Sequence, residues 1–207
     1  MAISTYTELK AAIADFLNRE DLTAVIPTFI ALAEADFNRA VRHWRMEGRS
    51  EATIDTQYSG IPADWLETIR FNISTTEGTR GLELIGHSEM ADRRGEAHDE
   101  SGIPKFYSMS GGQFEVLPAP DGDYTADLLY YQSIDALSDS NATNWLLTYY
   151  PDAYLYTALM HSAPYLDDDQ RTTTWAALSA SSRDNINISS NHARFSGTGL
   201  KMKIRSY

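Results

Sequence analysis

The side chains that could do chemistry are mainly five histidines and 29 carboxylates. None of the histidines stands in a His-Glu-x-x-His pattern, which would place two zinc ligands and a general base on one helix face. His98-Asp99-Glu100 is the densest run of potential metal ligands, but it lies between Gly95 and Gly102 in a polar stretch. Such a stretch is typical of a solvated loop. We therefore expect no metal site.

Catalytic and cofactor signatures are also missing from the sequence. There is no Gly-rich phosphate loop, no dinucleotide fingerprint after a strand and no Gly-x-Ser-x-Gly elbow. Cys is absent, which excludes thiol catalysis and iron–sulfur clusters. Asp167-Asp168-Asp169 is explained as acid at a helix start, where it complements the helix dipole. We name no catalytic residue and expect no cofactor, although 29 acids leave a hydrolytic Asp/Glu pair open.

The formal charge of the chain is uneven. Seventeen basic and 29 acidic residues give a net charge of −12, which repels phosphate and disfavours tight binding of nucleic acid. Residues 194–207 contain Arg194, Lys201, Lys203 and Arg205 and no acid, so this tail is +4 and the remainder is −16. No run of 18 apolar residues occurs, so we expect no membrane-spanning helix.

The tail also has a strand-like pattern. Lys201, Lys203 and Arg205 alternate with Met202 and Ile204, while Gly197 and Gly199 disfavour a helix. One interpretation is a frayed terminus. The other is an extended arm that adds to a partner's sheet or groove. The residues that would form such an arm are Arg194, Phe195, Leu200, Lys201, Met202, Lys203, Ile204 and Arg205.

Helical patterns occupy both ends of the chain. Thr5 to Glu8 is a capping box, and the apolar spacing after it predicts a helix over 6–18. A second apolar stripe predicts a long helix over about 26–47, with one face buried and one face outward. Its buried face would carry Phe29, Phe37 and Trp44, and its outer face Glu34, Arg39, Arg42 and Arg45.

The middle of the chain changes to a strand period. Alternating apolar residues predict strands over 53–56, 66–73, 82–85 and 124–132, and a hairpin pairing 105–109 with 113–117. Ser88 to Arg94 is typical of one or two helical turns. Helical patterns then return, with a restart at Pro151, a break at Pro164 and a last helix over about 168–190 that buries Trp175, Leu178, Ser182 and Ile186.

These elements predict an α+β fold: an antiparallel helical bundle with an inserted antiparallel β region and an extended C-terminal arm. The expected divisions are a helical core domain from 1–50 and 138–192, a β-rich insertion over 51–137 and an arm over 193–207. Twelve Tyr, seven Phe and four Trp favour contacts with other subunits, because aromatic residues are enriched in interface cores.

Several motifs, in order along the chain, resemble the head-to-tail adaptor proteins of tailed phages. The motifs are Thr5–Lys10, Phe16–Arg19, Val25–Ile30, Ile61–Glu67, Leu117–Gly122, Leu137–Asn141, Thr143–Leu147 and Ala193–Gly197. The resemblance covers nearly the whole chain and implies a virion protein that is made in the bacterial host cytoplasm.

The resemblance also implies partners. Such a protein forms a ring, usually of twelve copies, between the portal and the tail of the phage neck. The ring extends the DNA channel, so DNA passes without specific binding. The C-terminal arm would bind the portal, and loops of the β region would dock tail or nozzle proteins. A virion-associated peptidoglycan hydrolase with an Asp/Glu pair is the enzymatic alternative, and a host interaction module is a third; our expectation is a non-enzyme.

Overall fold

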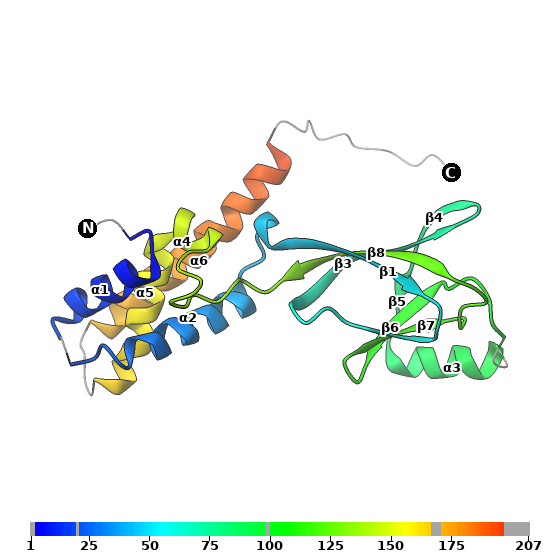
Figure 1. Cartoon of the computed structure of the whole chain (residues 1–207), viewed down its shortest axis with the longest axis horizontal. Helices are drawn as coiled ribbons and strands as arrows, with labels where there is room; N and C mark the ends of the chain where they lie inside the picture. Colours follow the sequence, from blue (N-terminus) through cyan, green and yellow to red (C-terminus); the bar gives the residue numbers. More distant parts are fainter. Residues whose placement is uncertain (1–2, 20, 98–99, 167–170, 197–207) are drawn as a thin grey trace. The chain divides into compact units, whose positions relative to one another are not determined.

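The chain divides into two compact units in the computed structural model, which describes residues 3–19, 21–97, 100–166 and 171–196 (Figure 1). Unit 1 is built from both ends of the chain, Met1–Arg45 and Ile134–Tyr207, and unit 2 is the continuous stretch Met46–Ser133. The divisions expected from the sequence lie after residues 50 and 137, a few residues further along the chain.

Unit 1 is helical and is organised around one central helix. Its helices are α1 (Tyr6–Leu17), α2 (Ile26–Ala40), α4 (Trp145–Tyr149), α5 (Pro151–Ser162) and α6 (Thr172–Phe195), with a short 3-10 turn, η2 (Ala163–Tyr165). Helix α5 packs against α1, α2 and α6. It buries seven side chains, on several sides of the helix, as expected for a helix surrounded by others.

The capping box predicted for α1 is present. The Thr5 hydroxyl accepts a hydrogen bond from the Glu8 backbone N–H at 3.3 Å, and the Glu8 carboxylate accepts one from the Thr5 N–H at 3.1 Å. Pro151 begins α5, where the missing N–H of a proline costs nothing. Local chemistry therefore sets both of these helix starts.

Unit 2 contains two four-stranded sheets. The first has the order β1-β8-β3-β4, with β1 (Glu47–Ile54), β8 (Tyr124–Gln132), β3 (Trp65–Thr75) and β4 (Gly78–Gly81). The second has the order β2-β7-β6-β5, with β2 (Tyr58–Gly60), β7 (Gln113–Leu117), β6 (Phe106–Ser110) and β5 (Glu83–Leu84). A 3-10 turn, η1 (Trp44–Met46), precedes β1.

Alternate residues of the strands meet between the two sheets. Phe114 and Val116 of β7 pack with Phe71 and Ile73 of β3 and with Leu128 of β8. Leu117, the residue after Val116 and the last of β7, faces the other way and joins the cluster with Met90 of helix α3 (His87–Ala97). Strand β7 is therefore covered on both faces, by the first sheet and by α3.

The predicted architecture is wrong. Six helices and two sheets in the described residues make an α+β fold and not a helical bundle with an inserted antiparallel β region. The second sheet is mixed, because β5 pairs in parallel with β6 after a crossover through α3. The extended arm is also not observed at its expected start, because α6 continues to Phe195.

Two further expectations fail for local reasons. Ile69 is one of the alternating apolar residues behind the strand predicted over 66–73, but it is 39% exposed because β3 shifts register between Thr68 and Arg70. Leu178 was expected on the buried face of the last helix, but it is 38% exposed and Ser179 is buried in its place.

Candidate functional site

Helix α6 continues beyond the core of unit 1. Its buried side chains, spaced by three or four residues, form one face made of Trp175, Ser179, Ser182, Ile186 and Ser190. The small serines allow close approach of neighbouring helices, and the Ser179 hydroxyl lies 2.8 Å from the Thr157 hydroxyl of α5. Ser190 is the last buried residue, and residues 191–196 are all exposed. The end of α6 therefore offers its side chains to solvent.

The chain that follows α2 is hydrogen-bonded to α6. The Asn187 side chain accepts from the Arg42 backbone N–H at 3.0 Å and donates to the Ala40 carbonyl at 3.2 Å. One turn further along α6, the Ser190 hydroxyl accepts from the Trp44 backbone N–H at 3.0 Å. These contacts replace the helical hydrogen bonds that residues after Ala40 would need.

The helix predicted over 26–47 is therefore wrong beyond Ala40. Val41 has an extended backbone, and the chain forms the separate turn η1. As a consequence Trp44 does not share the buried stripe with Phe29 and Phe37, and it is 40% exposed. The apolar period continues through residue 44, but the partners that end the helix lie on α6.

The chain that returns from β8 is held by α2. Asn38 accepts from the Ile134 backbone N–H at 2.9 Å, and Glu34, one turn earlier, accepts from the Leu137 N–H at 2.7 Å. Tyr154 of α5 donates its hydroxyl to the same Glu34 oxygen at 3.2 Å. Glu34 was predicted on the outer face but is buried, and this burial raises the pKa of its carboxyl group.

A histidine supports the aromatic residues beside the end of α6. The His43 ring is 2% exposed and stacks on Trp145 at a centroid distance of 5.0 Å. Its Nδ1 accepts from the Arg45 backbone N–H at 3.2 Å. Burial, with the charges of Arg45 and Arg194, lowers the pKa of His43 from 6.5 to about 4. His43 is therefore a neutral ring near pH 7.

The neighbouring surface combines two exposed rings with one cation. The Arg45 guanidinium carbon lies 4.4 Å from the centroid of the Trp44 ring and 4.0 Å from that of Tyr149. Trp44 is 40% exposed and Tyr149 is 55% exposed. Trp, Tyr and Arg are the residue types that dominate binding energy in protein interfaces. We call these three residues the Trp44–Arg45–Tyr149 patch.

Comparison with known families decides the class of protein. Residues 4–199 match the SU10 adaptor protein family. The chain belongs to that family. The SU10 adaptor family is a family of phage head-to-tail adaptors, so the resemblance inferred from the motifs is confirmed. The chain is therefore a phage structural adaptor, and this class implies a place in the virion. No curated protein matches the sequence.

The residues predicted to bind the portal are only partly described in this SU10 adaptor. Arg194 and Phe195 lie in the last turn of α6, where Phe195 is 68% exposed. The positive charge of Arg194 acts on His43, beside the Trp44–Arg45–Tyr149 patch. The other six, Leu200, Lys201, Met202, Lys203, Ile204 and Arg205, lie outside the described residues.

The weak metal candidates lie mostly outside the described part of the adaptor. His98 and Asp99, and all of Asp167-Asp168-Asp169, are not described. Within residues 3–19, 21–97, 100–166 and 171–196, no three His, Asp or Glu side chains are grouped as metal ligands. In the same ranges no helix is both long and apolar enough to cross a bilayer.

Sequence reasoning missed the Trp44–Arg45–Tyr149 patch. Trp44 was assigned to the core, and Tyr149 was counted only among the aromatic residues that favour contacts with other subunits. The two residues are 105 positions apart, and they meet because Trp44 is hydrogen-bonded to α6 while the neighbouring His43 stacks on Trp145 of α4. The pair Trp44-Arg45 at the end of an apolar stripe could have indicated the patch, because the guanidinium of an arginine can stack on the ring of a neighbouring aromatic residue.

Proposed function

We propose that this adaptor forms a ring, of about twelve copies, between the portal and the tail, and that its C-terminal segment binds the portal. One observation carries the proposal: α6 extends past its last buried residue, Ser190, and brings Arg194 and Phe195 into solvent. Membership of a head-to-tail adaptor family supports the same assignment.

The chemistry of residues 194–207 suits docking to another protein. The segment has a formal charge of +4, whereas the rest of the chain has −16. Within the segment, Leu200, Met202 and Ile204 alternate with polar residues. Charge would guide the encounter, while apolar side chains and main-chain hydrogen bonds would hold the complex. The Trp44–Arg45–Tyr149 patch lies near Arg194, the first residue of this segment, and would extend the same binding surface.

The remaining parts of the proposal concern the channel and the tail. A protein of net charge −12 repels DNA phosphates, which favours passage of DNA without specific binding. Loops of unit 2 would dock tail or nozzle proteins. The role is structural and not enzymatic, in keeping with the family. Release of soluble fragments from purified peptidoglycan, abolished by a single Asp or Glu substitution, would contradict this.

The test of portal binding is capture of the adaptor by immobilised cognate portal. Deletion of 194–207 removes no residue of the buried α6 face, so we expect unchanged folding and at least a tenfold loss of capture. Replacement of Lys201, Lys203 and Arg205 by Gln should weaken capture less, and mainly at low salt, because exposed charges are screened. Equal capture of the full-length and truncated chains would refute the proposal.

A further inference from the structure

Unit 2 has two sheet edges on the same side of its core. Strand β1 is the outermost strand of the first sheet, and β2 is the outermost strand of the second. No described strand pairs with the outer edge of either one. An edge strand presents unpaired backbone N–H and C=O groups, which are a template for another strand. With eight residues, β1 is long enough to pair with a partner over its whole length.

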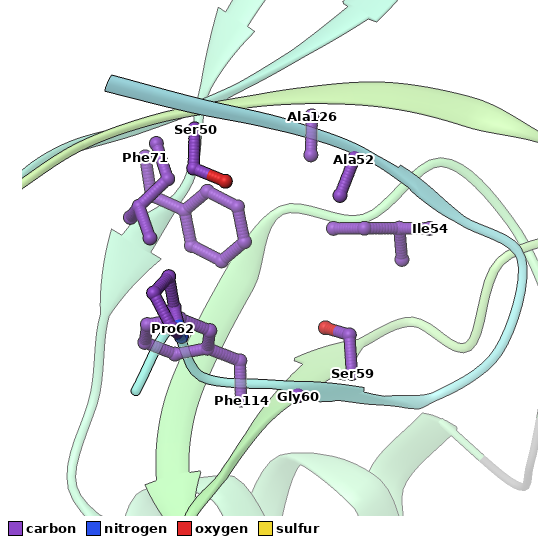
Figure 2. A pocket seen from close by; sticks show the side chains of 10 residues that line it. Ser50, Ala52, Ile54, Ser59, Gly60, Pro62, Phe71, Phe114 and Ala126 are labelled. Atoms are coloured by element: carbon purple, nitrogen blue, oxygen red, sulfur yellow. The ribbon is translucent and has the colours of Figure 1, made fainter. Parts of the chain in front are cut away.

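An apolar slot lies between these two edge strands. Figure 2 shows Ser50, Ala52 and Ile54 of β1 on one side of the slot and Ser59 and Gly60 of β2 on the other. The rings of Phe71 and Phe114 and the side chain of Pro62 line it as well. Its volume is about 50 Å³, a size that suits the end of one aliphatic side chain.

The slot is open because the sequence places small residues at this edge. Ser50, Ala52 and Ile54 alternate along β1 and all line the slot, so they share one face of the strand. Ile54 is 1% exposed, but Ala52, two residues earlier on the same face, is exposed. The core between the sheets is thus closed at Ile54 and reaches solvent at Ala52. A strand added beside β1 would cover this opening with its own side chains.

We propose that β1 binds an extended segment of a tail-side protein in which apolar and basic side chains alternate. The main chain of that segment pairs with the outer edge of β1, and an apolar side chain fills the slot at Ala52. The proposal rests on tail docking by unit 2, and it names the strand and the chemistry that would perform it. This mode of recognition takes affinity from main-chain hydrogen bonds and specificity from pockets for alternate side chains.

The charge of unit 2 argues for a basic partner. Residues 46–133 contain sixteen Asp and Glu against six Lys and Arg, a formal net charge of −10. On the other face of β1, the Arg49 guanidinium already bonds Asp127 and Glu51, both at 2.7 Å. Arg70 lies 3.7 Å from the same Asp127, so the paired charges of this face balance. The net charge of −10 of unit 2 as a whole would attract the basic side chains of an added strand and would repel an acidic strand.

The direct test is a titration of the ¹⁵N-labelled full chain with synthetic peptides. The first peptide has nine residues with alternating Val and Lys, and the second has Glu in place of each Lys. We expect the Lys peptide to shift the amide signals of residues 47–54 and to slow their hydrogen exchange. The Glu peptide should bind at least tenfold more weakly. Equal binding of both peptides, or no shift in β1, would overturn the proposal.

A third peptide, with the sequence of residues 197–207, tests a different occupant. Its Leu200, Met202 and Ile204 alternate with basic residues, so it carries the same pattern. Binding to β1 more tightly than the Val-Lys peptide would assign the edge to the C-terminal segment of a second copy and would overturn the tail-side assignment. Weaker binding supports it.

Matched variants of β1 locate the contact. Ala52→Leu fills the slot with an apolar side chain and should reduce affinity for the Lys peptide at least tenfold. Ala52→Lys should do the same by placing a charge at the slot. Thr53→Leu adds the same apolar side chain as Ala52→Leu at the next, also exposed, position on the opposite face, changes no charge, and should reduce affinity less than threefold. Equal losses at positions 52 and 53 would contradict a role for the slot.

These measurements also separate this proposal from portal binding. Ala52→Leu should leave capture by the portal unchanged, because the proposed portal contacts belong to unit 1. Normal capture by the portal without peptide binding at β1 would contradict the edge-strand proposal and leave the portal proposal intact. Peptide binding at β1 without capture by the portal would contradict only the proposal that the C-terminal segment binds the portal.

Discussion

Ser190 and Trp44 are joined by a hydrogen bond in which the Trp44 backbone N–H donates to the Ser190 hydroxyl at 3.0 Å. Ser190 is the last buried residue of α6, and Trp44 is the first residue of the turn through which the chain leads on to unit 2. Its side chain forms one wall of the Trp44–Arg45–Tyr149 patch. A single bond thus links the end of α6 to both the patch and the connection between the units.

Replacement of Ser190 tests this link. Ser190→Ala leaves the part-buried Trp44 N–H without this acceptor, and the loss of such a hydrogen bond costs about 0.5–1.5 kcal/mol. We expect a loss of this size in the free energy of unfolding, measured with urea. Ser181→Ala, at an exposed position of the same helix, is the control and should change stability by less than about 0.5 kcal/mol. Equal effects of the two substitutions would show that the bond contributes nothing.

Phe37 tests the core of unit 1. Its ring is completely buried and meets the Tyr154 ring edge-on, with centroids 5.1 Å apart. Phe37→Ala should cost about 3–5 kcal/mol of unfolding free energy, because the cavity cannot collapse fully. Phe16→Ala removes the same group from a site that is 47% exposed, and it should cost far less. A loss below about 1 kcal/mol for Phe37→Ala would place that ring outside the core.

Acid should destabilise the protein through His43. Its pKa is lowered to about 4, so between pH 6.5 and 4 the unfolded chain binds a proton that the folded chain does not. Stability from this residue is complete above pH 6.5 and falls by about 3 kcal/mol towards pH 4. Glu34 acts in the opposite direction, because burial raises the pKa of its carboxyl group above the ordinary value of 4.5. The stability that comes from Glu34 therefore falls as the pH rises above 4.5.

The contribution of His43 is isolated by comparing variants. His43→Phe keeps an aromatic ring against Trp145 and removes the titration, so the difference from wild type should shrink or reverse as the pH falls from 7 to 4. His87→Gln, at an exposed position of α3, serves as the reference. Thermal unfolding at a series of pH values supplies the measurement. Parallel curves for wild type and His43→Phe would show that His43 does not titrate in this window.

The patch should matter for binding and little for folding. Trp44→Ala and Tyr149→Ala each remove a ring that contacts the Arg45 guanidinium, and each should weaken capture by the portal at least tenfold. Leu32→Ala, at another exposed apolar position of unit 1, is the matched control and should leave capture unchanged. Surface plasmon resonance with immobilised portal gives the affinities. Wild-type affinity in both ring variants would remove the patch from the interface.

Local patterns predicted the elements that local chemistry determines. The strand Tyr124–Gln132 was predicted with the bounds that it has, because turn residues precede it and its alternation is regular. The start of α1 at Tyr6 followed from its capping box. The end of α2 did not follow, since Asn187 and Ser190, which hold the chain after Ala40, lie about 145 positions away. Glu34 was misplaced for the same reason, because its partners Leu137 and Tyr154 are distant in sequence.

The candidate site was predictable only in its chemistry. Charge and alternation marked the C-terminal segment, but the helix that carries Arg194 and Phe195 was predicted to end at 190 and ends at Phe195. The two-sheet arrangement of unit 2 was not visible, because the alternation of β5 and β6 says nothing about which strands become neighbours or whether they run in parallel. The slot between β1 and β2 was hidden for the same reason.

Electron microscopy of the full-length adaptor mixed with its cognate portal tests directly whether the adaptor forms a ring that binds the portal through its C-terminal segment. We predict a ring of adaptor copies on the portal, with density for the segment after Ser190 in contact with portal subunits and with none of this contact after deletion of 194–207. Adaptor particles that remain separate from the portal at every salt concentration, or a ring in which the segment after Ser190 touches no portal subunit, would contradict it.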